Sequence, residues 1–110
     1  MKSVFQKQIV LASLFFLVLF TACNPNVEDI LEKPSKYANK KVEVSGTVTK
    51  SNGIFGAGYY YIEDKTGEIP VLTTKGLPNE GEEVTVKGKV SQMLKIEGLQ
   101  VVGIMETERD

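Results

Sequence analysis

Three consecutive tyrosines, Tyr59 to Tyr61, are the residues of this chain best suited to chemistry with a ligand. A tyrosine offers a flat apolar ring with a polar tip, so it packs on an apolar group and also forms a hydrogen bond. Glu63 and Asp64 follow directly, but adjacent residues of a strand point to opposite faces. They therefore do not form the carboxylate pair of an acid–base catalyst. The segment indicates binding rather than catalysis.

Alternation along this strand divides the tyrosines between two faces. If Ile62 points into the protein, Tyr60 points inward with it. Tyr59, Tyr61 and Glu63 then point outward. The glycine-rich segment 51–58 (SNGIFGAG) precedes the strand, and we expect it to be an exposed loop. The candidate ligand-binding residues are three outward-facing side chains of the strand and one aromatic side chain of the loop: Tyr59, Tyr61, Glu63 and Phe55. The alternative is that the tyrosines only cover a thin core.

The composition excludes several kinds of active site. The 110 residues contain no histidine, no tryptophan and one cysteine. Without histidine there is no Ser-His or Cys-His nucleophile pair and no histidine site for a metal or haem. The glycines at 53–58 lack the Lys-Ser/Thr ending and the following helix of a phosphate-binding loop. We therefore expect no catalytic residues, no cofactor and no metal.

Two segments of period two supply the elements around the tyrosines. Residues 41–50 (KVEVSGTVTK) and 82–92 (EEVTVKGKVSQ) alternate valine with polar residues, as half-buried strands do. Each has a glycine in its apolar register, Gly46 in the first and Gly88 in the second. A glycine at such a position marks a strong bend or the close approach of another backbone. Both segments are therefore predicted to be curved strands.

The remaining elements are a hairpin, a last strand and a short helix. YYYIED and EIPVLT flank a turn in which Gly67 suits the left-handed position. The last strand is predicted from about Ile96 to Glu106, with bends at Gly98 and Gly103. Asn26 is predicted to cap a short helix, which would plug one end of the barrel that these strands are expected to form. Five short, glycine-bent strands do not hide two faces as an open sheet, whereas a closed barrel removes the exposed edges.

The N-terminal residues are predicted to be a targeting segment. Lys2 and Lys7 precede an apolar run at 9–20 (IVLASLFFLVLF), which has the length of a signal-peptide core and falls short of the roughly 20 residues that span a bilayer. With Cys23 after small residues, the pattern resembles a bacterial lipoprotein signal, although Phe20 stands where that family usually has an aliphatic residue. The resemblance implies cleavage before Cys23 and lipid on its thiol. An ordinary secretory signal and an uncleaved anchor are the alternatives.

Three stretches of the remaining chain resemble the OB-fold, specifically its anticodon-binding-like group, which also includes small exported bacterial proteins. They are ILEKPSKYANKKVEVSGTV, YYYIEDKTGEIPV and GEEVTVKGKV. The resemblance implies an all-β, five-stranded Greek-key barrel with a short N-terminal helix, preceded by a cleaved signal peptide. The expected division is a signal peptide at 1–22, a lipidated tether at 23–26 and the OB-fold domain at 27–110. In the anticodon-binding group an aromatic side chain matching Tyr59 stacks on a base, but the position of the base-reading polar side chain is Pro70 here.

The fold does not select the ligand, because OB barrels bind oligonucleotides, saccharides, peptides and proteins. The chain after residue 22 carries 11 Lys and Arg against 14 Asp and Glu, a net charge of −3. Phosphate neutralisation supplies nearly all non-specific affinity for nucleic acid, and this balance opposes it. We expect a lipid-anchored, non-catalytic module on the periplasmic side or surface of the cell envelope, with a protein segment, peptide or glycan as ligand. Binding of single-stranded nucleic acid is the alternative.

Overall fold

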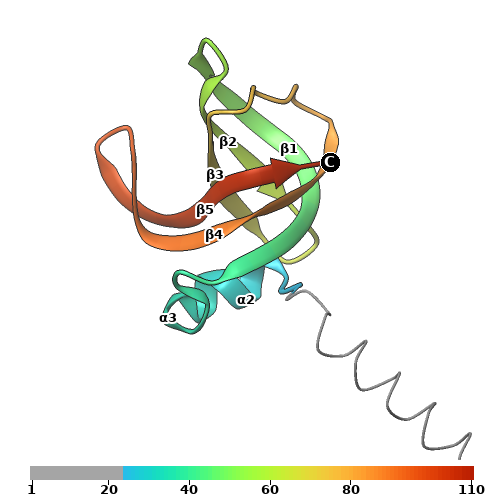
Figure 1. Ribbon diagram of the computed structural model, residues 1–110. Helices are drawn as coiled ribbons and strands as arrows, with labels where there is room; N and C mark the ends of the chain where they lie inside the picture. Colours follow the sequence, from blue (N-terminus) through green and yellow to red (C-terminus); the bar gives the residue numbers. More distant parts are fainter. Residues whose placement is uncertain (1–23) are drawn as a thin grey trace, which may run out of the picture.

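The computed structural model describes residues 24–110, which form two short helices and five strands (Figure 1). Their bounds are α2 (Val27–Glu32), α3 (Pro34–Tyr37), β1 (Lys41–Ile54), β2 (Ala57–Glu63), β3 (Glu68–Thr73), β4 (Glu83–Ile96) and β5 (Leu99–Arg109). The strands close into a barrel in the order β1-β2-β3-β5-β4, in which β3 and β5 are parallel and the other neighbours antiparallel. This confirms the predicted five-stranded OB-type barrel with an N-terminal helix. The expected signal peptide and the lipidation at Cys23 lie outside the described residues.

Alternating apolar residues build the core of the barrel, as their period predicted. The buried residues of β1 and β4 that share this inward face are Val42, Val44, Val48, Val84, Val86 and Val90. The β2–β3 hairpin adds Tyr60, Ile62, Ile69 and Val71, all fully buried. Each such side chain contributes roughly 1.5–3 kcal/mol when removed from water. The predicted inward direction of Tyr60 is therefore confirmed.

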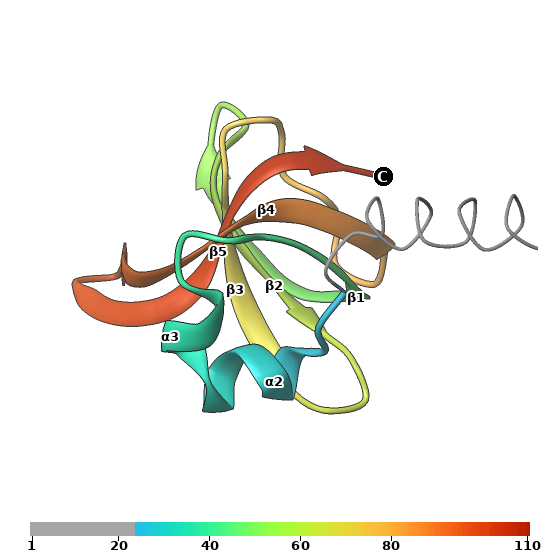
Figure 2. The ribbon, with the colours of Figure 1, turned by 60° about the horizontal axis from the view of Figure 1, so that its bottom comes forward.

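Helix α2 closes one end of the barrel (Figure 2). Asn26 is its N-cap, as predicted, and forms a capping box with Asp29. Val27 and Ile30 of the helix are fully buried and belong to the barrel core. Neither helix of residues 24–110 is long and apolar enough to cross a membrane.

Asp64, in the turn between β2 and β3, fastens α2 to the barrel. Its carboxylate accepts hydrogen bonds from the backbone N–H of Val27 (2.9 Å) and of Gly67 (3.1 Å), and from the N–H and hydroxyl of Thr66 (2.7 and 2.6 Å). Partial burial by itself raises the pKa of Asp64, but these hydrogen bonds outweigh it and hold the pKa below its ordinary value. The ionised carboxylate is thus the form that this turn stabilises.

The depressed pKa of Asp64 predicts a loss of stability in acid. Because the unfolded chain binds this proton more readily, the contribution of Asp64 is present above its unfolded pKa of about 3.9 and is lost as the pH falls through the lower folded value. We expect the stability difference between wild type and Asp64→Asn to be largest near neutral pH and to shrink below about pH 4. Urea unfolding between pH 2 and 7 measures it. Glu108→Gln, on the exposed surface of β5, is the control; an Asp64→Asn difference that is constant with pH contradicts the prediction.

The glycine-rich segment 51–58 is not the loop that its composition predicted. Strand β1 continues to Ile54 and β2 begins at Ala57, so only Phe55 and Gly56 form the turn, with φ of 54° and 80°. Two positive φ angles define the tight type I′ turn of β-hairpins. A Cβ on Gly53 would lie 2.3 Å from the carbonyl oxygen of Ala57. The glycines therefore permit two backbones to approach closely, rather than making a flexible loop.

Two further predictions of turn geometry were wrong. Gly67 does not adopt the left-handed conformation that was predicted for it, since its φ is not positive. Asp64 closes this turn instead, by accepting hydrogen bonds from the backbone N–H groups of Thr66 and Gly67. Ile96 ends β4 instead of beginning the last strand. It pairs with Leu99 across the turn Glu97-Gly98, whose φ angles are 52° and 81°. Apolar residues stand on both sides of this turn, so the sequence pattern did not indicate that one strand ends at Ile96 and the next begins at Leu99.

A buried polar cluster occupies the barrel at the far end of β3 from the turn that holds α2. The side chain of Glu106 is fully buried and accepts hydrogen bonds from the hydroxyls of Tyr60 and Thr73 (2.7 Å for Thr73) and from the guanidinium of Arg109 (2.9 Å). Burial and the hydrogen bond to Glu106 raise the pKa of Tyr60 far above its ordinary range. Within residues 24–110 no buried side-chain nitrogen or oxygen lacks a hydrogen-bond partner, which is the condition for burying a charged group.

Candidate functional site

Tyr59 and Tyr61 lie on the outer face of β2, as alternation predicted, and both are half-buried. Their ring centroids are 6.0 Å apart and their planes meet at 85°, an edge-to-face contact. The two rings are thus nearly perpendicular, with the edge of one against the face of the other. They do not present two parallel faces on which successive bases of a nucleic acid stack.

Polar side chains of β1 lie beside the two rings. In the strand register, Lys50 is opposite Tyr61 and Asn52 is opposite Tyr59. The amide of Asn52 donates to the hydroxyl oxygen of Tyr59 (3.2 Å), and the Lys50 ammonium lies 6.0 Å from each ring centroid. At that distance a cation is attracted to the ring face. The lysine and the amide therefore belong to the same surface as the tyrosines.

The turn between β4 and β5 completes this surface. The Tyr59 hydroxyl donates a hydrogen bond of 2.7 Å to the carboxylate of Glu97. We call the set of Lys50, Asn52, Tyr59, Tyr61 and Glu97 the tyrosine patch. Alternation along β2 identified the two tyrosines, whereas no sequence pattern assigned the other three residues to a site.

Two irregularities of the strands position the tyrosine patch. Val48 pairs with Ile62 and Lys50 with Tyr61, so Thr49 is an extra residue that forms a bulge in β1. Val48 points inward, and without the extra residue strict alternation would turn Lys50 inward as well. With the bulge, Lys50 points outward beside Tyr61.

The second irregularity is the shift of register between Ser91 and Leu94 in the pairing of β4 with β5. Leu94 and Pro70 meet over Gly103, where an added Cβ would lie 2.6 Å from Leu94 Cδ1 and 3.1 Å from Pro70 Cγ. Because Pro70 pairs with Tyr61 on β2, this contact brings the β4–β5 hairpin to the tyrosines. Glu97 reaches Tyr59 from its tip.

Phe55 lies apart from the tyrosine patch. It occupies the tip of the β1–β2 hairpin, four residues before Tyr59, with its side chain fully exposed and its neighbour Ile54 70% exposed. A φ of 54° is strained for a bulky residue, and such strain persists only where the surrounding structure enforces it. The hydrogen bond from the N–H of Gly76 to the carbonyl of Gly56, 2.9 Å long, holds this turn.

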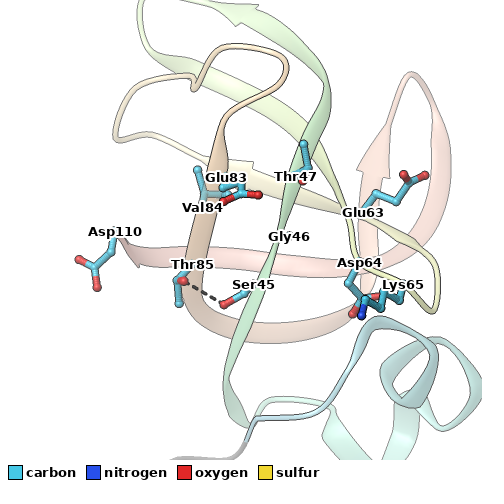
Figure 3. Close-up of a pocket in the computed structure, with 10 residues that line it drawn as sticks. All are labelled: Ser45, Gly46, Thr47, Glu63, Asp64, Lys65, Glu83, Val84, Thr85 and Asp110. Carbon is cyan, nitrogen blue, oxygen red and sulfur yellow. Dashed lines mark hydrogen bonds between the residues drawn. The ribbon is translucent and has the colours of Figure 1, made fainter.

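Glu63 is two residues beyond Tyr61 and lines a different surface, a hollow of about 670 Å³ (Figure 3). The residues around this hollow are Ser45, Gly46, Thr47, Glu63, Asp64, Lys65, Glu83, Val84, Thr85 and Asp110. Among these residues, the hydroxyls of Ser45 and Thr85 form a hydrogen bond of 2.9 Å. Carboxylates outnumber its single lysine, so the hollow repels phosphate groups. Within residues 24–110 there is no group of three or more histidine, cysteine, aspartate or glutamate side chains that could hold a metal.

Comparison with known proteins gives structural neighbours only. No protein-family model and no curated protein matches the sequence. A protein described as an aspartyl-tRNA synthetase from Leishmania major Friedlin superposes with a TM-score of 0.62 at 11% identity, over 82% of this chain and 20% of that one. Asparaginyl-tRNA synthetase from Pyrococcus horikoshii gives 0.59 at 14% identity, over 78% and 22%.

A third neighbour matches along nearly its whole length. The hypothetical protein ygiW from E. coli has a TM-score of 0.54 at 18% identity, over 82% of this chain and 96% of that one. The chain therefore spans about a fifth of each synthetase but nearly all of ygiW. At these identities the similarity is one of fold alone. Together with the closed barrel and the strand order of this chain, the similarity identifies its fold as the OB-fold.

Proposed function

We propose that this protein is a lipid-anchored, non-catalytic binding module of the cell envelope that holds its ligand at the tyrosine patch. The observation that carries the proposal is the placement of the patch. Four of its five residues lie on the β1–β2 hairpin, which projects from the barrel on the side away from α2 (Figures 1 and 2). The described chain begins at residue 24, next to α2. A module tethered through its N-terminus presents this hairpin away from the membrane.

The ligand proposed is a protein segment, a peptide or a glycan. The tyrosine patch combines one cation, Lys50, with one anion, Glu97, and therefore has no net charge. Tyrosine rings supply apolar contact area without needing a charged ligand. The acidic hollow around Glu63 and the net charge of −3 after residue 22 disfavour a polyanion.

A single-stranded nucleic acid is the second candidate. It is favoured by the two synthetases among the structural neighbours, whose names connect them with tRNA, and by the aromatic pair beside Lys50. Base stacking contributes about 1–3 kcal/mol per base. The perpendicular rings and the single cation of the tyrosine patch make this candidate the weaker one.

Two carboxylates of the described residues are engaged in structural contacts, which supports a non-catalytic role for them. Asp64 is engaged by the turn and by α2, and Glu106 is enclosed by its three donors. A catalytic carboxylate has to reach a proton on the substrate. Neither side chain is placed to do so.

The lipid anchor is tested by labelling. In a bacterial host that expresses the full chain with radioactive palmitate, we expect the wild type to take up label and to sediment with membranes. Cys23→Ser removes the acceptor thiol and should abolish the label, whereas Ser13→Ala, a small change within the apolar run, should leave it unchanged. A processed, unlabelled wild type in the soluble fraction contradicts the anchor and indicates an ordinary secretory signal.

A further inference from the structure

We infer that the tyrosine patch binds a glycan built of pyranose rings. The inference rests on the proposed function, because it names the ligand class of the same surface. Among the proposed ligands, a glycan fits the polar groups, the ring geometry and the strand pairing of the patch together.

The polar groups of the tyrosine patch match sugar hydroxyls. Asn52 offers both a donor and an acceptor, Glu97 offers carboxylate oxygens that only accept, and Lys50 offers an ammonium that only donates. The Tyr59 hydroxyl lies between two of them, at 3.2 Å from Asn52 and 2.7 Å from Glu97, which fixes both side chains in place. A sugar hydroxyl both donates and accepts, so this mixed set satisfies several hydroxyls of one ring.

The two rings match the apolar face of a pyranose. The C–H groups on one face of a sugar ring pack against an aromatic ring and require no charge on the protein. Tyr59 and Tyr61 stand at 85° with centroids 6.0 Å apart, so one ring faces the sugar while the other bounds its edge. Neighbouring strands are about 4.8 Å apart and alternate residues about 6.8 Å apart, so the patch is comparable in area with one or two sugar rings.

The strand pairing argues against a peptide that adds to the sheet here. Strand β2 pairs with β1 along Ala57–Glu63 and with β3 from Gly58 to Glu63. A peptide that binds by strand addition needs an open edge with free N–H and C=O groups. No such edge exists at Tyr59 and Tyr61, so ligand contacts there come from side chains.

Calorimetric titration tests the inference. The full chain is held in micelles of lauryldimethylamine oxide, a detergent without a sugar headgroup, and titrated with chitohexaose, cellohexaose and maltohexaose. We expect at least one hexasaccharide to bind with a Kd below about 1 mM. Asn52→Ala and Tyr61→Ala should weaken that binding tenfold or more, and Tyr61→Phe, which keeps the ring, should retain it.

A matched control separates a local effect from a general one. Lys36 lies 5.3 Å from the ring of Tyr37 on α3, so Lys36→Ala removes a lysine–tyrosine contact far from the tyrosine patch. We expect Lys36→Ala to bind as the wild type does, whereas Lys50→Ala weakens binding. If circular dichroism shows that Tyr61→Ala is unfolded, Asn52→Ala and Glu97→Gln, which change exposed side chains, decide the result.

Failure of the glycan and failure of the binding module have different signatures. Absence of binding by all three hexasaccharides at 10 mM, or binding that the patch variants leave unchanged, overturns the glycan inference. A displayed peptide library is screened in parallel. If no hexasaccharide binds at the patch but peptides are captured, and their capture is lost in Asn52→Ala and Tyr61→Ala, the glycan inference is overturned and the proposed module stands. If neither glycans nor peptides depend on the patch, both proposals fall.

Discussion

Replacement of Glu106 by alanine is expected to lower the free energy of unfolding by about 3–5 kcal/mol, the loss typical of breaking a buried ion pair. The carboxylate is fully buried and accepts from Tyr60, Thr73 and Arg109. Its removal leaves two hydroxyls and part of a guanidinium without an acceptor inside the barrel. Each unsatisfied group costs about 1–3 kcal/mol, and a charged one more.

Urea unfolding of the full chain at pH 7 measures this effect. Glu108→Ala is the matched control, because Glu108 is on the same strand with its side chain exposed, and it should change the unfolding free energy by less than about 0.5 kcal/mol. Glu106→Gln keeps the volume and one acceptor oxygen and should fall between the two. If Glu106→Ala costs less than about 1 kcal/mol, the cluster does not hold the barrel together in this way.

Gly88→Ala is expected to destabilise the barrel by about 3 kcal/mol, at the upper end of the usual cost of overpacking. A Cβ at residue 88 would lie 2.2 Å from the carbonyl oxygen of Met105 and 2.8 Å from Cγ2 of Ile104. The obstacle is the backbone of β5, which cannot rotate away as a side chain does. Strands β4 and β5 would have to separate at the point where their register already shifts.

Gly67→Ala is the matched control for Gly88→Ala. Its added Cβ would meet Val27 Cγ1 at 3.4 Å, an ordinary contact, and its backbone does not have positive φ. Thermal unfolding followed by circular dichroism should show a large fall in Tm for Gly88→Ala and a small change for Gly67→Ala. Similar changes in the two variants would mean that the approach of β5 to residue 88 does not limit the packing.

The fold was predictable because local patterns and barrel closure agree. Valine alternation defined the inward faces of β1 and β4, and glycines in the apolar register marked where another backbone approaches. The structure bears this out for Gly46, whose Cβ would lie 2.7 Å from the carbonyl oxygen of Glu63, as well as for Gly88. The extent of the hairpins was missed, because glycines that allow close approach look the same in sequence as glycines that make a loop.

The candidate site was predictable only in part. Alternation gave the directions of Tyr59 and Tyr61, because it depends on neighbours in the chain. Glu97, at the turn between β4 and β5, reaches Tyr59 from 38 residues away, and no local pattern indicates that contact. The inward direction of Glu106 did have a signal, since it lies two residues after Ile104 on the same strand face.

The central claim, that the tyrosine patch recognises a ligand without phosphate contacts, is tested most directly with nucleic acid itself. Fluorescent single-stranded DNA and RNA are titrated with the full chain in micelles at low and moderate salt, beside a Tyr59→Ala/Tyr61→Ala variant. We expect no binding tighter than about 0.1 mM at either salt concentration. Micromolar binding that weakens with salt and is lost in the variant would contradict the claim and make the tyrosine patch a nucleic-acid site.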